Sequence, residues 1–493
     1  MIEPSVISKR LVEPQTLKGF CDLLHGEMIA RNTVVEKIRT IYEKYGFLPL
    51  DTPILEHLVT LIGTGGEEVN KQLFRLESPE REPIAMRFDL TVPFARLLAQ
   101  YPDRLKLPFR RYHVGPVFRA DKPDPGRFRQ FTQMDMDAAG SASVAIDAEI
   151  IAAMCEVMKA LGLMNRTNNE GVVICEFQIR INNRKLVDAL LIGCGVTSRE
   201  TQKHVLRVVD KLQKVGLDNV RKELGEGRVD DSGDPIRGVG LSRDVIEQIV
   251  AFIAISENSR DEVINSLEKV LPGSDASKVA LQEMRDFATA LNCLKIDEPD
   301  AIFDPSLARG LDYYTGPIFE AFLPQAPEFG SVMGGGRYDQ LVERFLDVPI
   351  PATGVSIGLD RLIAALMHLG KIPHLSTTTK VLILAMPGTS IEKQLEVVSE
   401  LRAEHIPAEI YFGELGANMR SQLSFANSLG IPIAVILGED EIKNNQISIK
   451  NLKAGMESRV AIQDREGYRK AGKSGQITIQ RNQLMTSIKE MLA

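Results

Sequence analysis

The segment Phe131–Asp137 (FTQMDMD) carries polar side chains at every second position. Because side chains alternate between the two faces of a β-strand, Gln133, Asp135 and Asp137 share one face and the two methionines take the other. If the methionines face the core, the carboxylates face either water or a polar binding site. Alone, the pattern favours a half-solvated strand. Beside the arginines that flank it, the pattern indicates a binding surface.

Three arginines flank this segment. Arg119 ends the preceding strand-like stretch, and Arg127 and Arg129 open the next one. Guanidinium groups offer forked donors that suit phosphate and carboxylate oxygens. An exposed hairpin with surface salt bridges, which contribute little stability, would contain the same residues. Together with the carboxylates, the arginines indicate a site that holds a polyphosphate and a cationic group of a substrate.

Three glycine-containing segments could also contact a ligand. Arg309–Gly316 (RGLDYYTG) precedes Gly334–Asp339 (GGGRYD), whose three glycines allow a backbone to approach a ligand closely, although a flexible turn has the same composition. Gly467–Ser474 matches the P-loop pattern GxxxxGK[ST], but a working P-loop follows an apolar strand and opens a helix. Here polar residues precede the match and a strand-like stretch follows it, so we interpret it as a chance match.

The flanking arginines and the polar strand lie on a predicted antiparallel hairpin. Its strands are Arg110–Arg119 and Phe128–Asp137, and the turn-rich segment Asp121–Gly126 joins them. Further strands are predicted at Ile318–Leu323 and Ala352–Gly358.

Two elements precede the hairpin. Apolar residues at helical spacing predict a helix over Gly26–Tyr45 that ends at Gly46. The next stretch, Phe47–Leu55, is extended but contains two prolines, which cannot donate hydrogen bonds to a neighbouring strand. It is therefore predicted to be an edge strand or an interface strand.

The length and pattern of the chain indicate several domains. A chain of 493 residues is too long to form a single ordinary hydrophobic core, and its length suggests roughly three domains. Helical periodicity over residues 186–298, with a loop at Gly225–Gly240, predicts a helical insertion between two parts of one domain, 1–185 and 299–375. After Ser376–Thr379, strands alternate with helices, which predicts a separate α/β domain over residues 380–493 with a largely parallel sheet.

The composition is that of a globular protein, with 44% hydrophobic and 25% charged residues. The sequence contains no apolar run of the ~18 residues that a membrane helix needs, and no signal-peptide pattern at the N-terminus. The five cysteines are unclustered, which fits reduced thiols in a cytoplasmic protein. The net charge of −7 lacks the basic signature of a nucleic-acid-binding protein, although a large enzyme can still carry a local basic surface.

Several of these segments resemble the histidyl-tRNA synthetases, a family of class II aminoacyl-tRNA synthetases. Arg309–Gly316 is similar to the family's histidine-specific signature, and Leu17–Leu24 and Arg87–Thr91 also match. Tyr45–Glu56 resembles class II motif 1, Phe118–Asp137 resembles motif 2, and Gly354–Arg361 resembles motif 3. The resemblance implies a homodimer with a six-stranded antiparallel catalytic sheet flanked by helices, a helical insertion and a C-terminal α/β anticodon-binding domain.

The resemblance also implies the reaction and the residues that carry it. Histidine and ATP, with Mg²⁺, would form a histidyl-adenylate, which a ribose hydroxyl of histidine tRNA would then attack. Asp137 and Tyr314 would hold the two imidazole nitrogens, and Arg309 would stabilise charge at the α-phosphate. The implied histidine-binding residues are Asp89, Leu90, Thr91, Arg119, Gln133, Asp137, Arg309, Tyr313 and Tyr314; those for ATP are Arg119, Arg127, Phe131 and Arg361; the catalytic residues are Arg309 and Arg119.

The sequence departs from the family pattern at three places. Asp89 and Asp137 stand where many members carry glutamate, Ser356 and Asp360 replace a glycine and a glutamate, and the loop Ala120–Gly126 lacks some basic residues. That loop would contact the acceptor end of the tRNA, so recognition of an extra 5′ guanosine is left open.

Two alternatives share parts of this pattern. A non-catalytic paralogue, such as the regulatory subunit of ATP phosphoribosyltransferase, usually lacks the C-terminal domain and the Arg309-type signature. A stress-sensing tRNA-binding module would need an attached kinase domain, and the sequence contains no kinase motifs.

Overall fold

The computed structural model describes residues 13–63, 70–122, 127–167, 173–230, 233–308, 313–373, 375–413, 416–453 and 475–492. The chain divides into two compact units. One contains the chain up to Asp22 and Thr33–Ile372, and the other contains Leu23–Asn32 and the chain from Pro373 onward.

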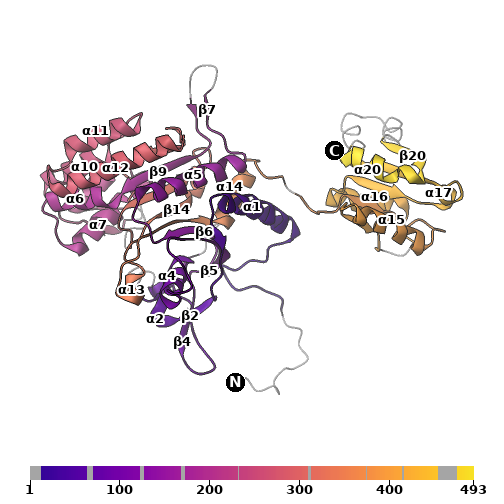
Figure 1. Cartoon of the computed structure of the whole chain (residues 1–493), viewed down its shortest axis with the longest axis horizontal. Helices are drawn as coiled ribbons and strands as arrows, with labels where there is room; N and C mark the ends of the chain where they lie inside the picture. Colours follow the sequence, from indigo (N-terminus) through magenta and orange to yellow (C-terminus); the bar gives the residue numbers. More distant parts are fainter. Residues whose placement is uncertain are drawn as a thin grey trace. The chain divides into compact units, whose positions relative to one another are not determined.

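The larger unit is built on an eight-stranded sheet in the order β1-β5-β6-β15-β14-β13-β9-β12 (Figure 1). The six central strands are antiparallel to one another, which confirms the predicted six-stranded antiparallel sheet. One short parallel strand extends the sheet at each edge. The strands are β1 (Leu48–Pro49), β5 (Phe109–Phe118), β6 (Gln130–Ala139), β15 (Ala352–Gly358), β14 (Ser331–Arg337), β13 (Pro317–Phe322), β9 (Gln178–Asn183) and β12 (Ala301–Phe303).

The predicted helix is confirmed, whereas the predicted extended stretch Phe47–Leu55 forms an edge strand of the large sheet only at Leu48–Pro49. Helix α1 (His25–Lys44) ends before Gly46, whose φ of +77° suits glycine. The chain then enters β1 at the sheet edge, the position that a strand containing Pro49 can occupy without losing an interior hydrogen bond.

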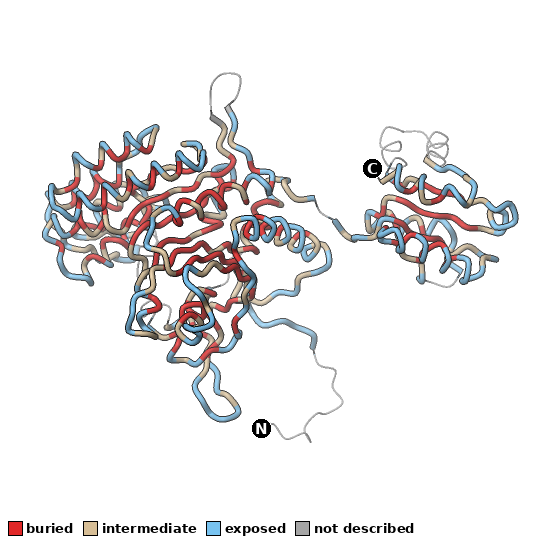
Figure 2. The backbone as a smooth tube through the Cα atoms, in the orientation of Figure 1, coloured by how far each residue is buried: buried red, intermediate tan, exposed pale blue. Residues whose placement is uncertain are grey.

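The central sheet is covered by helices and by a smaller sheet. Helices α5 (Val144–Ala160) and α14 (Leu359–His368) pack on the large sheet in one apolar cluster that includes both methionines of β6. Figure 2 shows the buried strands between more exposed helices. A second cluster contains residues of α4 (Thr91–Gln100) and α2 (Leu58–Leu61), beside a three-stranded sheet of β2 (Leu55–His57), β4 (Pro83–Met86) and β3 (Arg75–Glu77).

The insertion is helical, as expected, with one correction. Its helices gather near the β9 end of the sheet (Figure 1). The stretch Gly225–Gly240, predicted as a loop, contains an antiparallel pair of three-residue strands. A Cβ at Gly227 would lie 2.2 Å from the Ile236 carbonyl oxygen, so this strand pairing depends on glycine. The two strands are short and show no apolar alternation, so the sequence contains no strand signal here. The elements are α6 (Arg184–Gly193), α7 (Arg199–Val209), α8 (Leu212–Val215), α9 (Leu217–Leu224), β10 (Gly227–Val229), β11 (Pro235–Arg237), α10 (Arg243–Ile253), α11 (Arg260–Val270) and α12 (Asp275–Cys293).

The second unit has a five-stranded sheet in the order β17-β16-β18-β19-β20. Its first three strands are parallel, as predicted, and the last two are antiparallel additions. The P-loop-like segment Gly467–Ser474 lies outside the described residues. The elements are β16 (Val381–Ile383), α15 (Ile391–Ala403), β17 (Ala408–Ile410), α16 (Met419–Leu429), β18 (Ile433–Ile436), α17 (Glu439–Lys443), β19 (Gln446–Asn451), β20 (Gln476–Gln480) and α20 (Leu484–Leu492).

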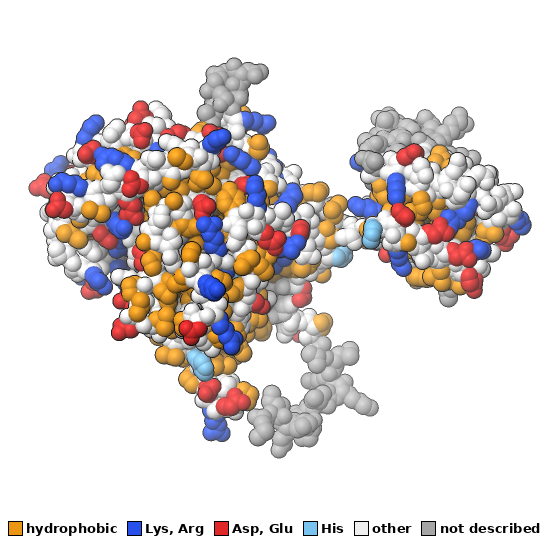
Figure 3. All heavy atoms as spheres, in the orientation of Figure 1, with side chains coloured by type: hydrophobic (Ala, Val, Ile, Leu, Met, Phe, Trp, Pro, Cys, Tyr) orange, Lys and Arg blue, Asp and Glu red, His pale blue; other side chains and the backbone are white. Residues whose placement is uncertain are grey.

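The surface in view carries Lys, Arg, Asp and Glu side chains interspersed with one another (Figure 3). In the part of the chain that the structure describes, no helix combines the length and the apolar character needed to cross a bilayer.

Candidate active site

A cavity of about 290 Å³ opens on the large sheet, where β6, β15, β14 and β13 lie side by side. Ten of the predicted site residues line it. The side chain of Leu90 is buried and does not line the cavity, and Arg309 lies outside the described residues. The ten are Asp89, Thr91, Arg119, Arg127, Phe131, Gln133, Asp137, Tyr313, Tyr314 and Arg361.

The alternation predicted for Phe131–Asp137 is observed, but the half-solvated alternative is wrong. Met134 and Met136 are fully buried in the core. On the other face, Gln133 and Asp137 line the cavity, and Asp135 is buried at 1% exposure. The polar face of β6 is therefore buried, and it meets the cavity at Gln133 and Asp137.

Asp137 is held from two sides. One oxygen lies 2.7 Å from Nη2 of Arg111, and the Tyr338 hydroxyl donates a hydrogen bond to the other. Burial raises the pKa of Asp137, and the adjacent Arg111 guanidinium opposes this shift. A Cβ at position 354 would lie 2.0 Å from Asp137 Oδ1, so only glycine leaves room for this carboxylate. Asp137 is thus a preoriented acceptor beside the cavity.

Asp89 and Gln133 supply further acceptors. Asp89 Oδ1 accepts hydrogen bonds from the backbone N–H groups of Thr91 (3.1 Å) and Val92 (2.9 Å), which begin α4. Burial raises the pKa of Asp89. Gln133 Oε1 is buried and has no hydrogen-bond partner among the residues that the structure describes. Buried acceptors of this kind normally find a donor, and a ligand ammonium group can provide one.

Arg119 directly follows β5 and packs against two aromatic rings. Its guanidinium carbon is 4.3 Å from the ring centre of Phe88 and 5.1 Å from that of Phe131. Its Nε donates to the Phe88 carbonyl oxygen at 3.2 Å. Such stacking fixes the plane of a guanidinium group, whose forked donors suit phosphate and carboxylate oxygens. Arg127 is more exposed, and Arg129 instead donates to the Asp121 carbonyl oxygen.

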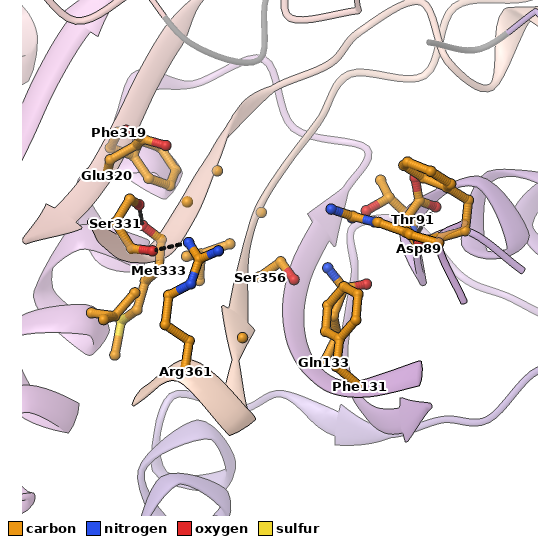
Figure 4. Close-up of a pocket in the computed structure, with 18 of the residues that line it drawn as sticks. Asp89, Thr91, Phe131, Gln133, Phe319, Glu320, Ser331, Met333, Ser356 and Arg361 are labelled. Carbon is orange, nitrogen blue, oxygen red and sulfur yellow. Dashed lines mark hydrogen bonds between the residues drawn. The ribbon is translucent and has the colours of Figure 1, made fainter. Parts of the chain in front are cut away.

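A second group of polar residues faces the first across the cavity (Figure 4). Arg361, at the start of α14, donates from Nη1 to the Ser331 carbonyl oxygen at 2.9 Å. Figure 4 shows Glu320, Ser331, Met333 and Arg361 on one side, Ser356 between, and Asp89, Thr91, Phe131 and Gln133 on the other.

The triple glycine is part of a strand, so its interpretation as a flexible turn is wrong. Gly334–Gly336 lies inside β14. A Cβ at Gly335 would lie 2.1 Å from the Gly354 carbonyl oxygen, and one at Gly336 would lie 2.6 Å from that of Pro317. At these two positions the close approach is between neighbouring strands, while Gly334 and Gly335 also line the cavity.

Several functional candidates were missed by sequence reasoning. Glu320 is 8% exposed and lines the cavity. Its only sequence signal is a single acidic residue in the apolar strand PIFEAF. Tyr338 and Arg111 contact Asp137. Arg111 lies opposite it on the predicted hairpin, whereas Tyr338 comes from a distant segment that no local pattern pairs with Asp137.

The two tyrosines of the Arg309–Gly316 segment form one unit. Their ring centres are 4.5 Å apart, and the Tyr313 hydroxyl donates to that of Tyr314 at 3.4 Å. Burial raises the pKa of both phenols, so both are neutral hydrogen-bonding groups at physiological pH.

Comparisons with known proteins identify the same family that the sequence motifs resemble. A family model described as histidyl-tRNA synthetase matches residues 19–362, and one described as anticodon binding domain matches residues 380–471. The histidine--tRNA ligase of Caulobacter vibrioides is 39% identical over 491 residues, covering 97% of each chain.

Solved structures give the same result for the fold. Histidyl-tRNA synthetase from Nostoc sp. PCC 7120 superposes with a TM-score of 0.79 at 29% identity, over 97% of this chain and 100% of that one. A Bacillus halodurans protein described as an ATP phosphoribosyltransferase regulatory subunit/histidyl-tRNA synthetase has a TM-score of 0.67 at 20% identity, over 87% of this chain and 99% of that one, which shows the shared fold alone. Since the family model covers most of the chain and the Caulobacter ligase nearly all of it, the chain belongs to the histidyl-tRNA synthetase family.

Proposed function

We propose that this chain attaches L-histidine to histidine tRNA in two steps, consuming ATP and releasing AMP and diphosphate. The observation that carries the proposal is the composition of the cavity. It combines buried carboxylate and tyrosine groups suited to an imidazole ring with arginines suited to phosphates.

The histidine end of the cavity would be formed by β6 and the start of α4. Asp137 would accept from one imidazole N–H, and the Tyr314 hydroxyl would bond to the other nitrogen, with Tyr313 shaping the pocket. Asp89, Thr91 and Gln133, with the Leu90 backbone between them, would surround the α-ammonium group, which needs acceptors. Asp137 as an acceptor and the Tyr314 hydroxyl as the partner of the other nitrogen would therefore select an amino acid that carries an imidazole.

The ATP end would be formed by Arg119, Arg127 and Arg361, with adenine stacked on Phe131. Arg119 would contact both the α-phosphate and the histidine carboxylate, and Arg309 would act beside it. A histidine carboxylate oxygen would attack the α-phosphorus while the bond to diphosphate breaks, and the arginines would stabilise the charge that develops. A tRNA ribose hydroxyl would then attack the adenylate carbonyl, and AMP would leave.

Mg²⁺ is expected with ATP, and Glu320 is the residue that best fits it. Its carboxylate is buried on the Arg361 side of the cavity, and carboxylate oxygens are the ligands that Mg²⁺ prefers. When bound, the ion would neutralise charge on the β- and γ-phosphates.

The remaining parts of the chain would serve binding and assembly. Residues 380–493 would bind the anticodon, and residues 186–298 would form an inserted helical domain within the catalytic domain (1–185 and 299–375). A homodimer in the cytoplasm is expected for this enzyme. Exposed apolar side chains on β1, β2 and α2 support pairing through this part of the chain: Leu48 is 60% exposed, Leu55 46% and Val59 75%.

Charging of histidine tRNA by the purified full-length chain tests the proposal. We expect histidine and ATP together to yield aminoacylated tRNA. Comparing transcripts with and without an extra 5′ guanosine shows which form is used. Failure to charge either transcript would refute the proposal.

A further inference from the structure

Arg111 on β5 lies outside the cavity lining but contacts both halves of the proposed histidine site. It is fully buried. Its Nη2 lies 2.7 Å from Asp137 Oδ2 and donates to the Leu90 carbonyl oxygen at 3.1 Å. One guanidinium nitrogen therefore joins the carboxylate proposed to hold the imidazole to the turn proposed to hold the ammonium group.

The Leu90 carbonyl lies in the middle of the ammonium-binding turn. Asp89 precedes it, and the next two residues donate their backbone N–H groups to the Asp89 carboxylate. The turn is thus closed on itself by two hydrogen bonds. A donor that fixes the Leu90 carbonyl consequently fixes the whole turn.

The position of the guanidinium group is itself constrained. Its central carbon lies 4.6 Å from the ring centre of Phe94, a fully buried residue of α4. Arginine stacks on aromatic faces and keeps a rigid planar fork, whereas lysine carries a point charge on a flexible stem. Arg111 therefore cross-links the sheet to α4 in a single geometry.

Two buried carboxylates lie beside Arg111, and its positive charge favours the ionised form of Asp137. Asp135 Oδ2 lies 3.7 Å from the same Nη2, so two buried carboxylates share one guanidinium group. Asp89, in the turn before α4, and the Tyr338 hydroxyl, on the residue after β14, also influence Asp137, and the phenols of Tyr42 and Tyr314 interact with it electrostatically. Burial already raises the pKa of Asp135 to about 7 beside Arg111, and without this guanidinium group the two carboxylates would repel each other and Asp137 would also take up a proton more readily.

We infer that Arg111 is a positioning residue for histidine: it sets the separation of Asp137 from the Asp89–Thr91 turn and keeps Asp137 ionised. The inference rests on the proposed function, since it takes these two groups as the contacts of the imidazole and the ammonium. It predicts an effect on histidine binding that ATP binding does not share, because the ATP-binding arginines are held by other contacts.

Arg111→Met and Arg111→Lys in the full-length chain test this role. KM for histidine and KM for ATP are measured by ATP–pyrophosphate exchange from about pH 7 to pH 8.5. For Arg111→Met we expect KM for histidine to rise roughly 30-fold, the loss typical of one charged hydrogen bond, with KM for ATP changed less than about 3-fold. We also expect this KM to fall as the pH rises, because Asp137 ionises again, whereas the parent stays flat.

The lysine variant separates charge from geometry. It keeps the positive charge, so the flat pH profile should return, but histidine affinity should recover only in part because the planar fork is lost. If Arg111→Met does not fold, the double variant Arg111→Met/Asp135→Asn contains one buried carboxylate fewer and should still show a raised KM for histidine.

Arg260 provides a matched control for the loss of a buried arginine. It is 2% exposed and donates to the carbonyl oxygens of Ala301, Ile296 and Asp297 in the region of the insertion. Arg260→Met should lower Tm and leave both KM values unchanged.

Two results would overturn the inference. In the first, Arg111→Met raises both KM values equally. In the second, it behaves like Arg260→Met. If the parent chain shows no histidine-dependent exchange at all, the proposed function itself fails. Normal exchange by both the parent and Arg111→Met would reject only the role of Arg111.

Discussion

Gly354 on β15 is a residue at which one added methyl group would act directly on the proposed histidine site. A Cβ there would lie 2.0 Å from Asp137 Oδ1, 2.5 Å from its Cγ and 2.8 Å from the Met136 carbonyl oxygen. Ordinary contacts of a Cβ begin near 3.4 Å. In Gly354→Ala the Asp137 carboxylate must therefore move by about 1 Å or more, since the close-packed strands cannot move freely.

The size of the effect follows from the bonds that this movement breaks. Asp137 would lose its pair with Arg111 at 2.7 Å and the hydrogen bond from Tyr338. The Tyr338 hydrogen bond to the charged carboxylate contributes about 1.5–3 kcal/mol, and breaking the buried ion pair with Arg111 adds to this loss, so we expect the free energy of unfolding to fall by about 3 kcal/mol or more. The displaced carboxylate would also miss the imidazole, and we expect KM for histidine to rise roughly 10²-fold.

Thermal unfolding and ATP–pyrophosphate exchange measure these two effects. Gly273→Ala is the control, because a Cβ at Gly273 meets nothing within 4 Å. In an Asp137→Ala background the added methyl should lower Tm less than it does in the parent, since most of the clash is removed. A parent-like KM for histidine in Gly354→Ala would refute the assignment of Asp137.

Other predictions address the pH dependence, the ATP end and the rejected motif. Burial raises the pKa of Asp135 to about 7 from an ordinary 3.8, so the stability gained by protonating it is complete at low pH and is lost as the pH rises through 7. Asp135→Asn should therefore raise Tm more at about pH 8 than at about pH 5, where the loss has only begun, and an equal change at both would contradict this. Arg361→Ala should raise KM for ATP roughly 10-fold or more and leave KM for histidine nearly unchanged, as measured by titrating each substrate. Arg309→Ala should slow adenylation by about 10²-fold or more, and a near-normal exchange rate would remove Arg309 from catalysis. Lys473→Ala should leave exchange nearly intact, and its complete loss would show that the P-loop-like segment is functional.

The elements that carry the site could be predicted because their patterns are local. The period of two in FTQMDMD separates methionines from acidic residues, and the structure keeps this separation with Met134 in the core and Asp137 at the cavity. The prolines before the hairpin likewise predicted an edge strand from the missing N–H donors alone.

The predicted hairpin already brings the residues near Arg110 to the level of Asp137, but Gly354 and Tyr338 could not be predicted as its neighbours, because they depend on the order of strands distant in the chain. Arg111 reaches Asp137 through the pairing of β5 with β6, and Gly354 faces it through the pairing of β15 with β6. A single sequence contains no signal that brings residue 354 to the same carboxylate. The glycines of β14 were ambiguous for the same reason, since the backbone they approach belongs to neighbouring strands.

Histidine-dependent ATP–pyrophosphate exchange by the purified full-length chain tests the central claim most directly. We predict exchange with histidine and ATP, and none when an amino acid without an imidazole replaces histidine. We also predict that Asp137→Ala abolishes exchange at histidine concentrations that saturate the parent. Absence of exchange with histidine, with or without added tRNA, would contradict the proposed function, and equal exchange with other amino acids would contradict the imidazole site.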